Sequence, residues 1–454
     1  APRPAPTLRR FPGRVPAARP FPFILFPILP GGAGGRQPSA ADADARPAAD
    51  PPPTDRRDAP MTLRLRLALV LYRALWWAAL PLVLLYLRRR ARRDPAYGLH
   101  LDERRGGGPV LPGAVLVHAV SLGEMRSAVP LVRALLDRGE RVVTTHLTPA
   151  GRRAAEAAFG PEIAEGRLLA RYLPFELGPA WRRFLAATAP RAVLVLEVEL
   201  WPVMIAECAR AGVPLWLVNS QVPGRSWPRA RALAHLIGHP VAGVAGVLAK
   251  SDRHAARFRT LGARNVQVTG ELRFDQPVPP GLLAAAAALK PRLGRPVVTL
   301  ASVVEGEDAL CLDLYRRLRA GFRARGTAPP LFVHVPRAPE RFGAAGNLLE
   351  AAGLRVVRRS AALGPALEPL ADLAGADVLL GDSMGEMYFY LALGDIAVAG
   401  GGFLPSGAHN VIEPLALRRP VLTGPHTWTI EYPGEEAAAA GVLTVCPDVA
   451  AMAA

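Results

Sequence analysis

Short apolar runs alternate with longer amphipathic segments along most of the chain. Such runs are typical of buried strands, and segments with apolar residues at helical spacing are typical of the helices between them. This βαβ rhythm predicts a parallel sheet covered by helices. The first series of predicted strands comprises residues 114–118, 141–145, 192–196, 214–218, 244–249 and 266–269.

A second series of strands follows a Pro-rich joint at residues 276–280. Two series predict two Rossmann-like α/β domains, which we place at 94–280 and 281–454. Ligands of open α/β sheets bind outside the carboxyl ends of the strands. We therefore expect the domains to face a cleft, with functional residues directly after strands. The second series is predicted at 296–300, 331–335, 354–357, 377–380, 396–398 and 420–422.

An apolar run at 67–87, interrupted by Arg73 and Pro81, precedes the first domain. As a helix it is about 31 Å long, enough to cross the hydrocarbon core of a bilayer. The two interruptions also leave open an interfacial helix, and a buried core helix is the third interpretation. We predict a membrane anchor at 61–93, whose basic flank keeps the next domain on the cytoplasmic side. The flank consists of Arg88, Arg89, Arg90, Arg92 and Arg93.

Residues 1–60 are rich in Pro, Arg and Ala and show neither helical nor strand periodicity. This composition predicts disorder, because the segment offers little apolar surface to bury. Met61 opens the charged entry to the apolar run and is the natural start of the protein. We interpret 1–60 as a disordered extension and as candidate translated upstream sequence.

The formal net charge is +17 and comes mostly from Arg. It favours anionic partners such as acidic phospholipids or a phosphorylated substrate. Zinc-knuckle spacing, aromatic RNA-binding motifs and helix-turn-helix patterns are missing from the sequence, so we expect no nucleic-acid partner. The three cysteines form no CxxC pair and have no His at metal spacing, which predicts no metal site and a reducing compartment.

Three motifs follow predicted strands of the first domain. Glu124 starts a helix after a turn at Gly123, where it is equally suited to act as a general base or to complement the helix dipole. Glu197 and Glu199 follow the strand at 192–196, and strand alternation predicts that one of them faces the cleft. Arg273 follows the last strand and suits a phosphate or carboxylate ligand, although a surface salt bridge is the commoner role.

The second domain places polar and Gly-rich segments after its strands, at 301–307, 335–341, 381–386 and 400–414. The last segment contains three consecutive glycines, Gly400 to Gly402, before a predicted helix. Free backbone N–H groups at such a loop and the helix dipole predict an anion cradle. Asn410 and Glu413 also have capping-box spacing, which is a purely structural alternative. The run of glycines favours phosphate binding.

Four of these motifs, taken in order, resemble the 3-deoxy-D-manno-octulosonic acid (Kdo) transferase family. They are Val120-Ser-Leu-Gly-Glu124, Glu197-x-Glu-Leu-Trp-Pro202, Pro336-Arg-x-Pro-Glu-Arg341 and His409-Asn-x-x-Glu-Pro414. The similarity runs from about Met61 to the end. It implies a GT-B fold, two Rossmann-like domains behind a membrane-associating N-terminus.

The resemblance also implies the chemistry. Glu124 would be the general base toward a lipid A precursor, and Glu197 and Arg273 would stabilise the transition state. Kdo would move from CMP-Kdo with inversion, without metal or cofactor, at the cytoplasmic face of the inner membrane in lipopolysaccharide biosynthesis. The cytidine monophosphate (CMP) would be held by Pro336, Arg337, Met384, Gly385, Glu386, Asn410, Val411, Ile412 and Glu413.

The chain departs from the family pattern at several positions. Arg273 stands where Lys is usual, which keeps the charge but changes its reach. Val303-Val304 replace Thr-His, Ala338 replaces His and Ala408 replaces Gly. The family continues with further helices beyond the position of Ala454, so we expect the second domain to be truncated. Two alternatives remain: a GT-B enzyme that uses a UDP-sugar in cell-wall synthesis, and a catalytically inactive nucleotide-binding homologue.

Overall fold

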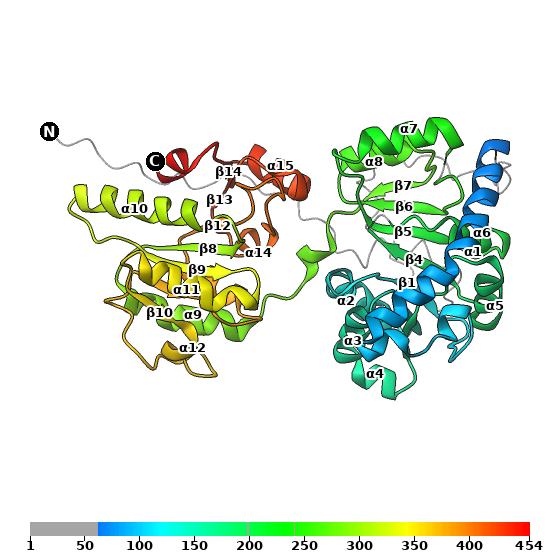
Figure 1. The fold of residues 1–454 in the computed structure, drawn as a ribbon, viewed down its shortest axis with the longest axis horizontal. Helices are drawn as coiled ribbons and strands as arrows, with labels where there is room; N and C mark the ends of the chain where they lie inside the picture. The colour runs from blue at the N-terminus through cyan, green and yellow to red at the C-terminus, as the bar shows by residue number, and fades with distance from the viewer. Residues whose placement is uncertain (1–61, 198, 240) are drawn as a thin grey trace, which may run out of the picture. The chain divides into compact units, whose positions relative to one another are not determined.

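The computed structural model describes residues 62–197, 199–239 and 241–454. The predicted extension at 1–60 and the start at Met61 lie outside the described residues. The described chain forms two compact units (Figure 1). The first contains the described residues through Gln221 together with Ala230–Asp275, and the second contains Val222–Arg229 and Gln276–Ala454.

The first unit is built on a sheet that has seven strands in the part of the chain described, in the order β3-β2-β1-β4-β5-β6-β7. All neighbouring strands are parallel, so their carboxyl ends share one edge. The strands are β1 (Val115–His118), β2 (Val142–His146), β3 (Leu168–Tyr172), β4 (Ala192–Leu196), β5 (Leu215–Ser220), β6 (Gly246–Ala249) and β7 (Val266–Val268).

Helices cover both faces of this sheet (Figure 1). Capping residues explain where two of them begin. The helix α2 begins after Ser121, whose side chain accepts the N–H of Glu124, and α3 begins after Thr148 with Pro149 in its first turn. The helices are α1 (Leu63–Ala91), η3 (Pro95–Gly98), η4 (Glu103–Arg105), α2 (Leu122–Asp137), α3 (Pro149–Ala158), α4 (Gly160–Ala164), α5 (Gly178–Thr188), α6 (Pro202–Arg210), α7 (Trp227–Ile237), α8 (Asp252–Thr260) and η5 (Leu272–Asp275).

Strand β3 was missed by the sequence analysis because Arg171 interrupts its apolar pattern. The structure buries Arg171 fully, and its guanidinium donates to the backbone carbonyls of Pro109, Glu103 and Gly107. Acceptors for both terminal nitrogens make a buried guanidinium tolerable. A strand with one charged residue can therefore lie inside the sheet without an apolar signature.

The second unit repeats the architecture with a parallel sheet, which has seven strands in its described residues, in the order β10-β11-β9-β8-β12-β13-β14. The strands are β8 (Val297–Val303), β9 (Leu331–Pro336), β10 (Val356–Arg358), β11 (Val378–Leu380), β12 (Ile396–Ala399), β13 (Val421–Thr423) and β14 (Leu443–Val445). The helices are α9 (Pro280–Leu293), α10 (Asp308–Ala324), η6 (Pro339–Arg341), α11 (Phe342–Ala351), α12 (Arg359–Ala362), α13 (Met387–Leu393), α14 (Ile412–Ala416), η7 (Trp428–Ile430), α15 (Glu431–Ala439) and α16 (Val449–Ala453).

Successive residues of the central strands of this second sheet enter different cores. Val333 of β9 packs in the core that also contains residues of α9 and α13, whereas its neighbour Phe332 packs with residues of α10 and α11. Side chains alternate across a strand, so a strand buried on both faces reads as a continuous apolar run. The two α/β units confirm the predicted fold class.

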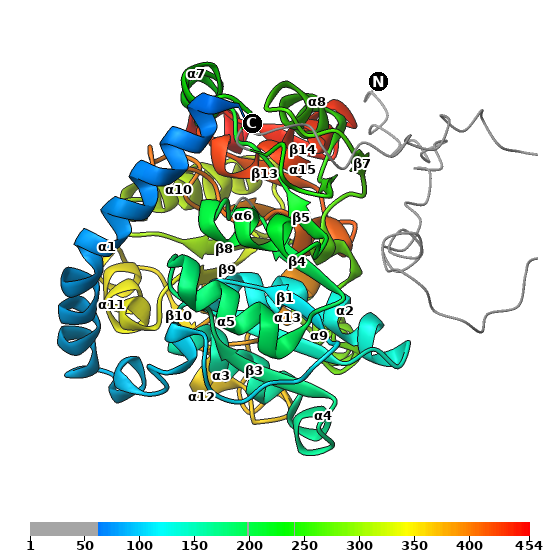
Figure 2. The same cartoon turned by 90° about the vertical axis from the view of Figure 1, so that its right-hand side faces the viewer.

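Helix α1 contains the predicted anchor and extends along the outside of the first unit (Figure 2). Among the described residues it is the one helix long and apolar enough to cross a membrane. Leu69 and Leu87 are its buried residues, so it is not a core helix. The inner face, including Trp76 and Leu80, packs near Phe175 and Leu177.

A polar contact also ties α1 to the first unit. The guanidinium of Arg73 lies 3.0 Å from the carboxylate of Glu207 on α6. Glu207 is almost completely buried. Glu207 also pairs with Arg182 and Arg210 at 3.1 and 2.7 Å. Arg73, which interrupts the apolar run in the sequence, thus has a partner inside the unit.

We expect Glu207→Ala to lower the free energy of unfolding by about 1–3 kcal/mol, because three guanidiniums lose a charged acceptor. Glu156→Ala is the matched control: Glu156 forms an exposed i,i+4 pair with Arg152, and such pairs contribute less than about 1 kcal/mol. Urea denaturation followed by circular dichroism in detergent measures both. Equal stability of the two variants would contradict this role of Glu207.

Candidate active site

Glu124 lies in the first turn of α2, directly beyond the carboxyl end of β1. Its carboxylate accepts the N–H of Val120 at 2.7 Å and lies 3.5 Å from the hydroxyl of Ser121. Ser121 in turn accepts the N–H of Glu124 at 3.4 Å. This is a capping arrangement, so the structural role considered from the sequence is present.

The capping role of Glu124 does not prevent its carboxyl from gaining and losing a proton. The pKa of Glu124 is raised to about 7, chiefly because burial disfavours its charge; the N–H of Val120 lowers it, and the carboxylates of Glu199 and Glu197 raise it. A carboxyl that titrates near neutral pH is suited to general-base catalysis. One side chain can therefore both cap the helix and exchange a proton.

Glu197 follows β4 and has a left-handed backbone, with φ of 57°. A residue other than Gly pays for this conformation with about 1–3 kcal/mol, so the surroundings must hold it. The alternation expected for Glu197 and Glu199 ends with β4 at Leu196 and does not decide which of them is functional. Burial raises the pKa of Glu197 and, separately, that of Glu199.

The sequence analysis missed three residues that surround Glu197. Lys250 follows β6 and lies 2.9 Å from both carboxylate oxygens of Glu197 and 2.8 Å from Glu271. Asn219, in β5, donates to Glu197 and to Glu271 at 3.0 Å each and also has a left-handed φ, 54°. We call Glu197, Asn219, Lys250 and Glu271 the strand-end network.

The predicted residue Arg273 contacts this network through Glu271, at 3.1 Å. Burial alone raises the pKa of Glu271, but Lys250 and Arg273 outweigh it and hold that pKa at about 2. The sequence did contain a signal for the network. Lys250 directly follows an apolar strand, and it is one of two lysines among 55 basic residues.

In the second unit, Pro336 ends β9 and Arg337 is the exposed residue that follows. The pKa of His409 is lowered to about 4, first by burial and then by the positive charge of Arg337. The charge of Arg337 therefore reaches the Gly-rich segment after β12. Strand order explains this, because β9, β8 and β12 are successive neighbours.

The predicted donor residues Met384, Gly385 and Glu386 follow β11, the other neighbour of β9. Met384 is 65% exposed, and Gly385 has a φ of 83° that favours glycine. The carboxylate of Glu386 lies 2.7 Å from the Nε of Arg359, so it is held by a charged partner inside the unit.

The Gly-rich loop differs from its prediction. Three of its N–H groups already have acceptors: Gly401 and Phe403 donate to the buried carboxylate of Glu307 at 2.7 and 3.3 Å, and Gly400 donates to the backbone of Ala301. A side chain at Gly402 would collide with the backbone of Gly424. Close packing and Glu307 thus explain the three glycines, and the cradle interpretation is wrong for these N–H groups.

Asn410 and Glu413 flank the start of α14. The side chain of Asn410 accepts the N–H of Ile412 at 2.9 Å, which fixes the turn before this short helix. Val411 and Ile412 are buried beneath that turn. The charge of Glu413 contributes, after burial, to the raised pKa of Tyr388 on α13. The segment 410–413 therefore lies near the residues that follow β11.

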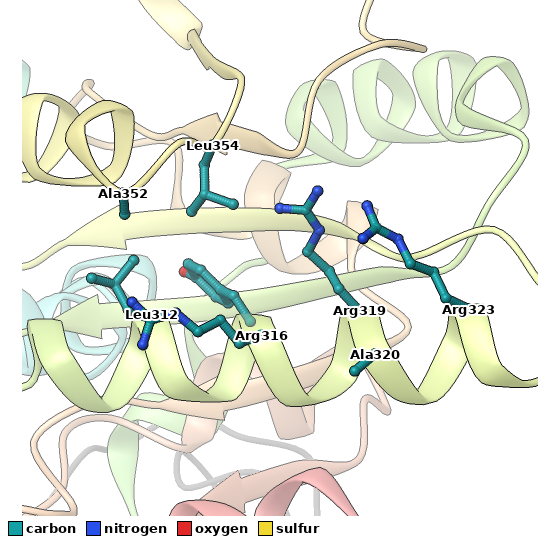
Figure 3. A pocket seen from close by; sticks show the side chains of 8 residues that line it. Leu312, Arg316, Arg319, Ala320, Arg323, Ala352 and Leu354 are labelled. Carbon is teal, nitrogen blue, oxygen red and sulfur yellow. The ribbon is translucent and has the colours of Figure 1, made fainter.

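A cavity of about 230 Å³ lies elsewhere in the second unit, beside α10 (Figure 3). Arg316, Arg319 and Arg323 of α10 line it, and Arg319 pairs with Asp377 at 3.3 Å. None of the predicted donor residues lines this cavity. Within the described residues, no group of three or more His, Cys, Asp or Glu side chains is arranged to hold a metal ion.

Comparisons with known proteins show that this chain is similar to one family of transferases. Residues 94–276 match the family model described as 3-deoxy-D-manno-octulosonic-acid transferase (kdotransferase). The 3-deoxy-D-manno-octulosonic acid transferase of Bordetella pertussis is 42% identical over 81% of this chain and 86% of its own. The protein of the same name from Haemophilus influenzae is 31% identical over 79% of this chain and 82% of its own.

Among solved structures, the C-terminal CMP-Kdo binding domain of WaaA from Acinetobacter baumannii is 27% identical, with a TM-score of 0.33. The match covers 38% of this chain and 84% of that domain.

We expect Glu307→Gln to destabilise the protein by about 1–3 kcal/mol, because one acceptor oxygen beneath the Gly-rich loop is lost. Glu305→Gln, at an exposed position of the same connection, is the control and should change stability little. Urea denaturation compares the two variants. If both unfold like the wild-type protein, Glu307 does not support the loop.

Proposed function

This chain belongs to the 3-deoxy-D-manno-octulosonic acid transferase family, and from that premise we propose how it transfers Kdo in lipopolysaccharide biosynthesis. The donor is CMP-Kdo and the acceptor is a hydroxyl of a lipid A precursor. Glu124 is the general base. The observation that carries the proposal is the half-buried carboxyl of Glu124, whose pKa of about 7 suits it to accept a proton at physiological pH.

The proposed reaction is a single displacement. Glu124 takes the proton of the acceptor hydroxyl as the oxygen forms a bond to the anomeric carbon of Kdo. The bond from that carbon to the phosphate oxygen breaks, and CMP leaves with the electron pair, so the anomeric configuration inverts. One base suffices, because the leaving phosphate is already charged and needs no proton.

The positive carbon that develops needs negative charge nearby, and the leaving phosphate needs positive charge. Glu197 supplies a carboxylate at the same sheet edge as Glu124, and Arg273 contacts the network around it. Stabilisation by fixed charges is effective when the charges are held before the reaction begins. Glu197 fits this requirement, because its side chain is held by hydrogen bonds from Asn219 and Lys250.

For the donor, we assign CMP to the carboxyl edge of the second sheet. Arg337 supplies an exposed guanidinium there, and Gly385 leaves room for close approach of a nucleotide. The remaining candidate contacts are Pro336, Met384, Glu386, Asn410, Val411, Ile412 and Glu413. These segments follow strands β9, β11 and β12 of one sheet, which supports a shared ligand.

We further propose that α1 lies on the cytoplasmic face of the inner membrane with its outer face in the lipid. Its inner face packs on the first unit, whereas its outer face exposes large apolar side chains, among them Leu67, Leu71 and Leu82. A Cβ at Gly238, after α7, would lie 2.8 Å from Thr62, so α7 ends beside the start of α1. The exposed Leu236 of α7 extends the apolar surface. Apolar side chains exposed in this way gain free energy when they are buried among lipid acyl chains.

We expect Glu124→Gln to lower Kdo transfer at least about a hundredfold while CMP binding is retained. The amide oxygen of Gln can still accept the N–H of Val120, so α2 keeps its cap. Purified protein is incubated with CMP-Kdo and a lipid A precursor, and products are measured by mass spectrometry. Near-normal turnover of this variant removes Glu124 from the mechanism.

A thermal-shift titration with UDP and CMP, combined with the transfer assay, separates the alternative functions. An enzyme specific for UDP-sugars would be stabilised thermally by UDP and not by CMP. An inactive homologue would be stabilised by CMP but would transfer no Kdo. The proposal expects thermal stabilisation by CMP together with transfer.

The rate of transfer should fall as the pH drops below about 7, which gives the pH profile an acid limb, because Glu124 acts as a base only above its pKa. Glu199→Gln removes one charge that raises this pKa, so its acid limb should shift to lower pH. Rate measurements from pH 5 to 9 test both statements. An unshifted limb in Glu199→Gln, or no limb in the wild type, argues against Glu124 as the titrating base.

Leu67→Glu/Leu71→Glu should weaken binding to vesicles of phosphatidylethanolamine and phosphatidylglycerol, because two apolar contacts with lipid become charged. The matched control is Glu305→Gln, far from α1 in the sequence and exposed. Flotation of vesicles with bound protein measures the effect. Unchanged flotation would exclude the outer face of α1 as the membrane surface.

A further inference from the structure

The strand-end network gathers four polar residues from four neighbouring strands. Glu197 directly follows β4, Asn219 lies in β5, Lys250 directly follows β6, and Glu271 lies in the turn after β7. These four strands lie side by side in the sheet. Lys250 and Glu271 are almost completely buried. Neither of these two can meet a substrate directly, so any function they have acts through other residues.

Lys250 is fully partnered inside this network. Its ammonium group has three protons, and three carboxylate oxygens lie within reach: two of Glu197 at 2.9 Å and one of Glu271 at 2.8 Å. A buried ammonium is costly unless such partners compensate for lost water. The geometry therefore fixes the ammonium between the two carboxylates.

The choice of lysine at this position is itself informative. The chain has only two lysines, Lys250 and Lys290, among its 55 basic residues. An ammonium is a compact charge that fits between two carboxylates, whereas the planar guanidinium of Arg needs more room. A chain that uses Arg at almost every other basic position thus has the smaller cation between these two carboxylates.

The network also holds the unusual backbone at Glu197. The side-chain amide of Asn219 donates to Glu197, and its carbonyl accepts the N–H of Leu272. The hydroxyl of Ser220 donates to the backbone carbonyl of Glu197 at 2.6 Å. Strained residues that are held by several bonds are typical of functional sites, where the strain fixes a side chain before the reaction.

We propose that Lys250 is a positioning residue for Kdo transfer: clamped by Glu271, it holds Glu197 as a carboxylate in a fixed place beside the base Glu124. The inference rests on the proposed function and extends it to two buried residues. Glu271 gives the lysine a permanent counter-charge, and Lys250 offsets the tendency of burial to protonate Glu197.

The electrostatic consequence depends on every charge around Glu197. Burial is the largest effect and raises the pKa of Glu197; Lys250 and Arg273 lower it, and Glu271 raises it, so that the pKa stays above its usual value. Loss of Lys250 would leave Glu197 and Glu271 without the cation between them, and the pKa of Glu197 would rise. The charged side chains that act on Glu197 are Lys250 after β6 and Glu271 and Arg273 after β7, and Glu197 in turn acts on Glu124 of α2.

A purely structural ion pair is the competing explanation, and pH separates the two. If Lys250 keeps Glu197 ionised, transfer in Lys250→Met requires both Glu124 and Glu197 to be deprotonated, so the variant should be slower at pH 7. Its acid limb should then be set by Glu197 instead of Glu124 and lie at least about one pH unit higher, a tenfold change in the ionised fraction. The sign follows because Glu197 would be a carboxylate only above its raised pKa. A structural role would lower the rate equally at all pH values.

Two further variants sharpen the experiment. Lys250→Met/Glu271→Gln also removes the carboxylate that would otherwise repel Glu197, so the acid limb should return toward that of the wild type. Lys290→Met is the control, because Lys290 forms a half-exposed pair with Asp395 in the second unit. Its pH profile should match that of the wild type. An unshifted limb in Lys250→Met overturns the proposal.

Nuclear magnetic resonance of the lysine side chains tests the proposal without measuring activity. Lysine labelled with ¹⁵N at Nζ gives two signals, and Lys290→Met assigns them. The Lys250 signal should titrate with Glu197, and Glu197→Gln should abolish that transition; an unaffected signal overturns the proposal even if Lys250→Met does not fold. If the wild-type protein transfers no Kdo, the proposed function fails, and this measurement alone still decides whether Lys250 holds Glu197.

Discussion

Parallel pairing of the strands is the constraint on which the rest of the structure depends. Because every strand in each described sheet has the same direction, every connection from strand to helix starts at the same edge. Residues that are far apart in the sequence, such as Glu124 and Lys250, thus follow strands of one sheet. The chemistry of each unit is concentrated at that edge.

At the edge of the first sheet, carboxyl groups in different surroundings have very different pKa values. Glu271 faces Lys250 and Arg273, which keep its pKa at about 2, whereas Glu124 is partly buried near other carboxylates and has a pKa of about 7. When the pKa values of two groups at one site shift in opposite directions, one group can keep a fixed charge while the other exchanges a proton. Glu271 suits the first task and Glu124 the second.

The sequence predicted the layout well and the contacts poorly. Continuous apolar runs located most strands, because strands buried on both faces lack alternation. Strand β3 was missed because the terminal nitrogens of the buried Arg171 donate to distant backbone carbonyls, which no local pattern reveals. Motifs placed Glu124 and Arg273 after strands, but the network around Lys250 joins four distant segments. The Gly-rich loop was misread, since the carboxylate of Glu307 beneath it comes from another connection.

A structure of the protein with CMP and a lipid A precursor bound together would test the central claim most directly. The account predicts an acceptor hydroxyl within about 2.6–3.2 Å of the carboxylate of Glu124, the distance required for proton transfer. It also predicts a cytidine monophosphate in contact with Arg337 and residues 410–413. A bound acceptor with no hydroxyl near Glu124, or a nucleotide held elsewhere, would contradict it.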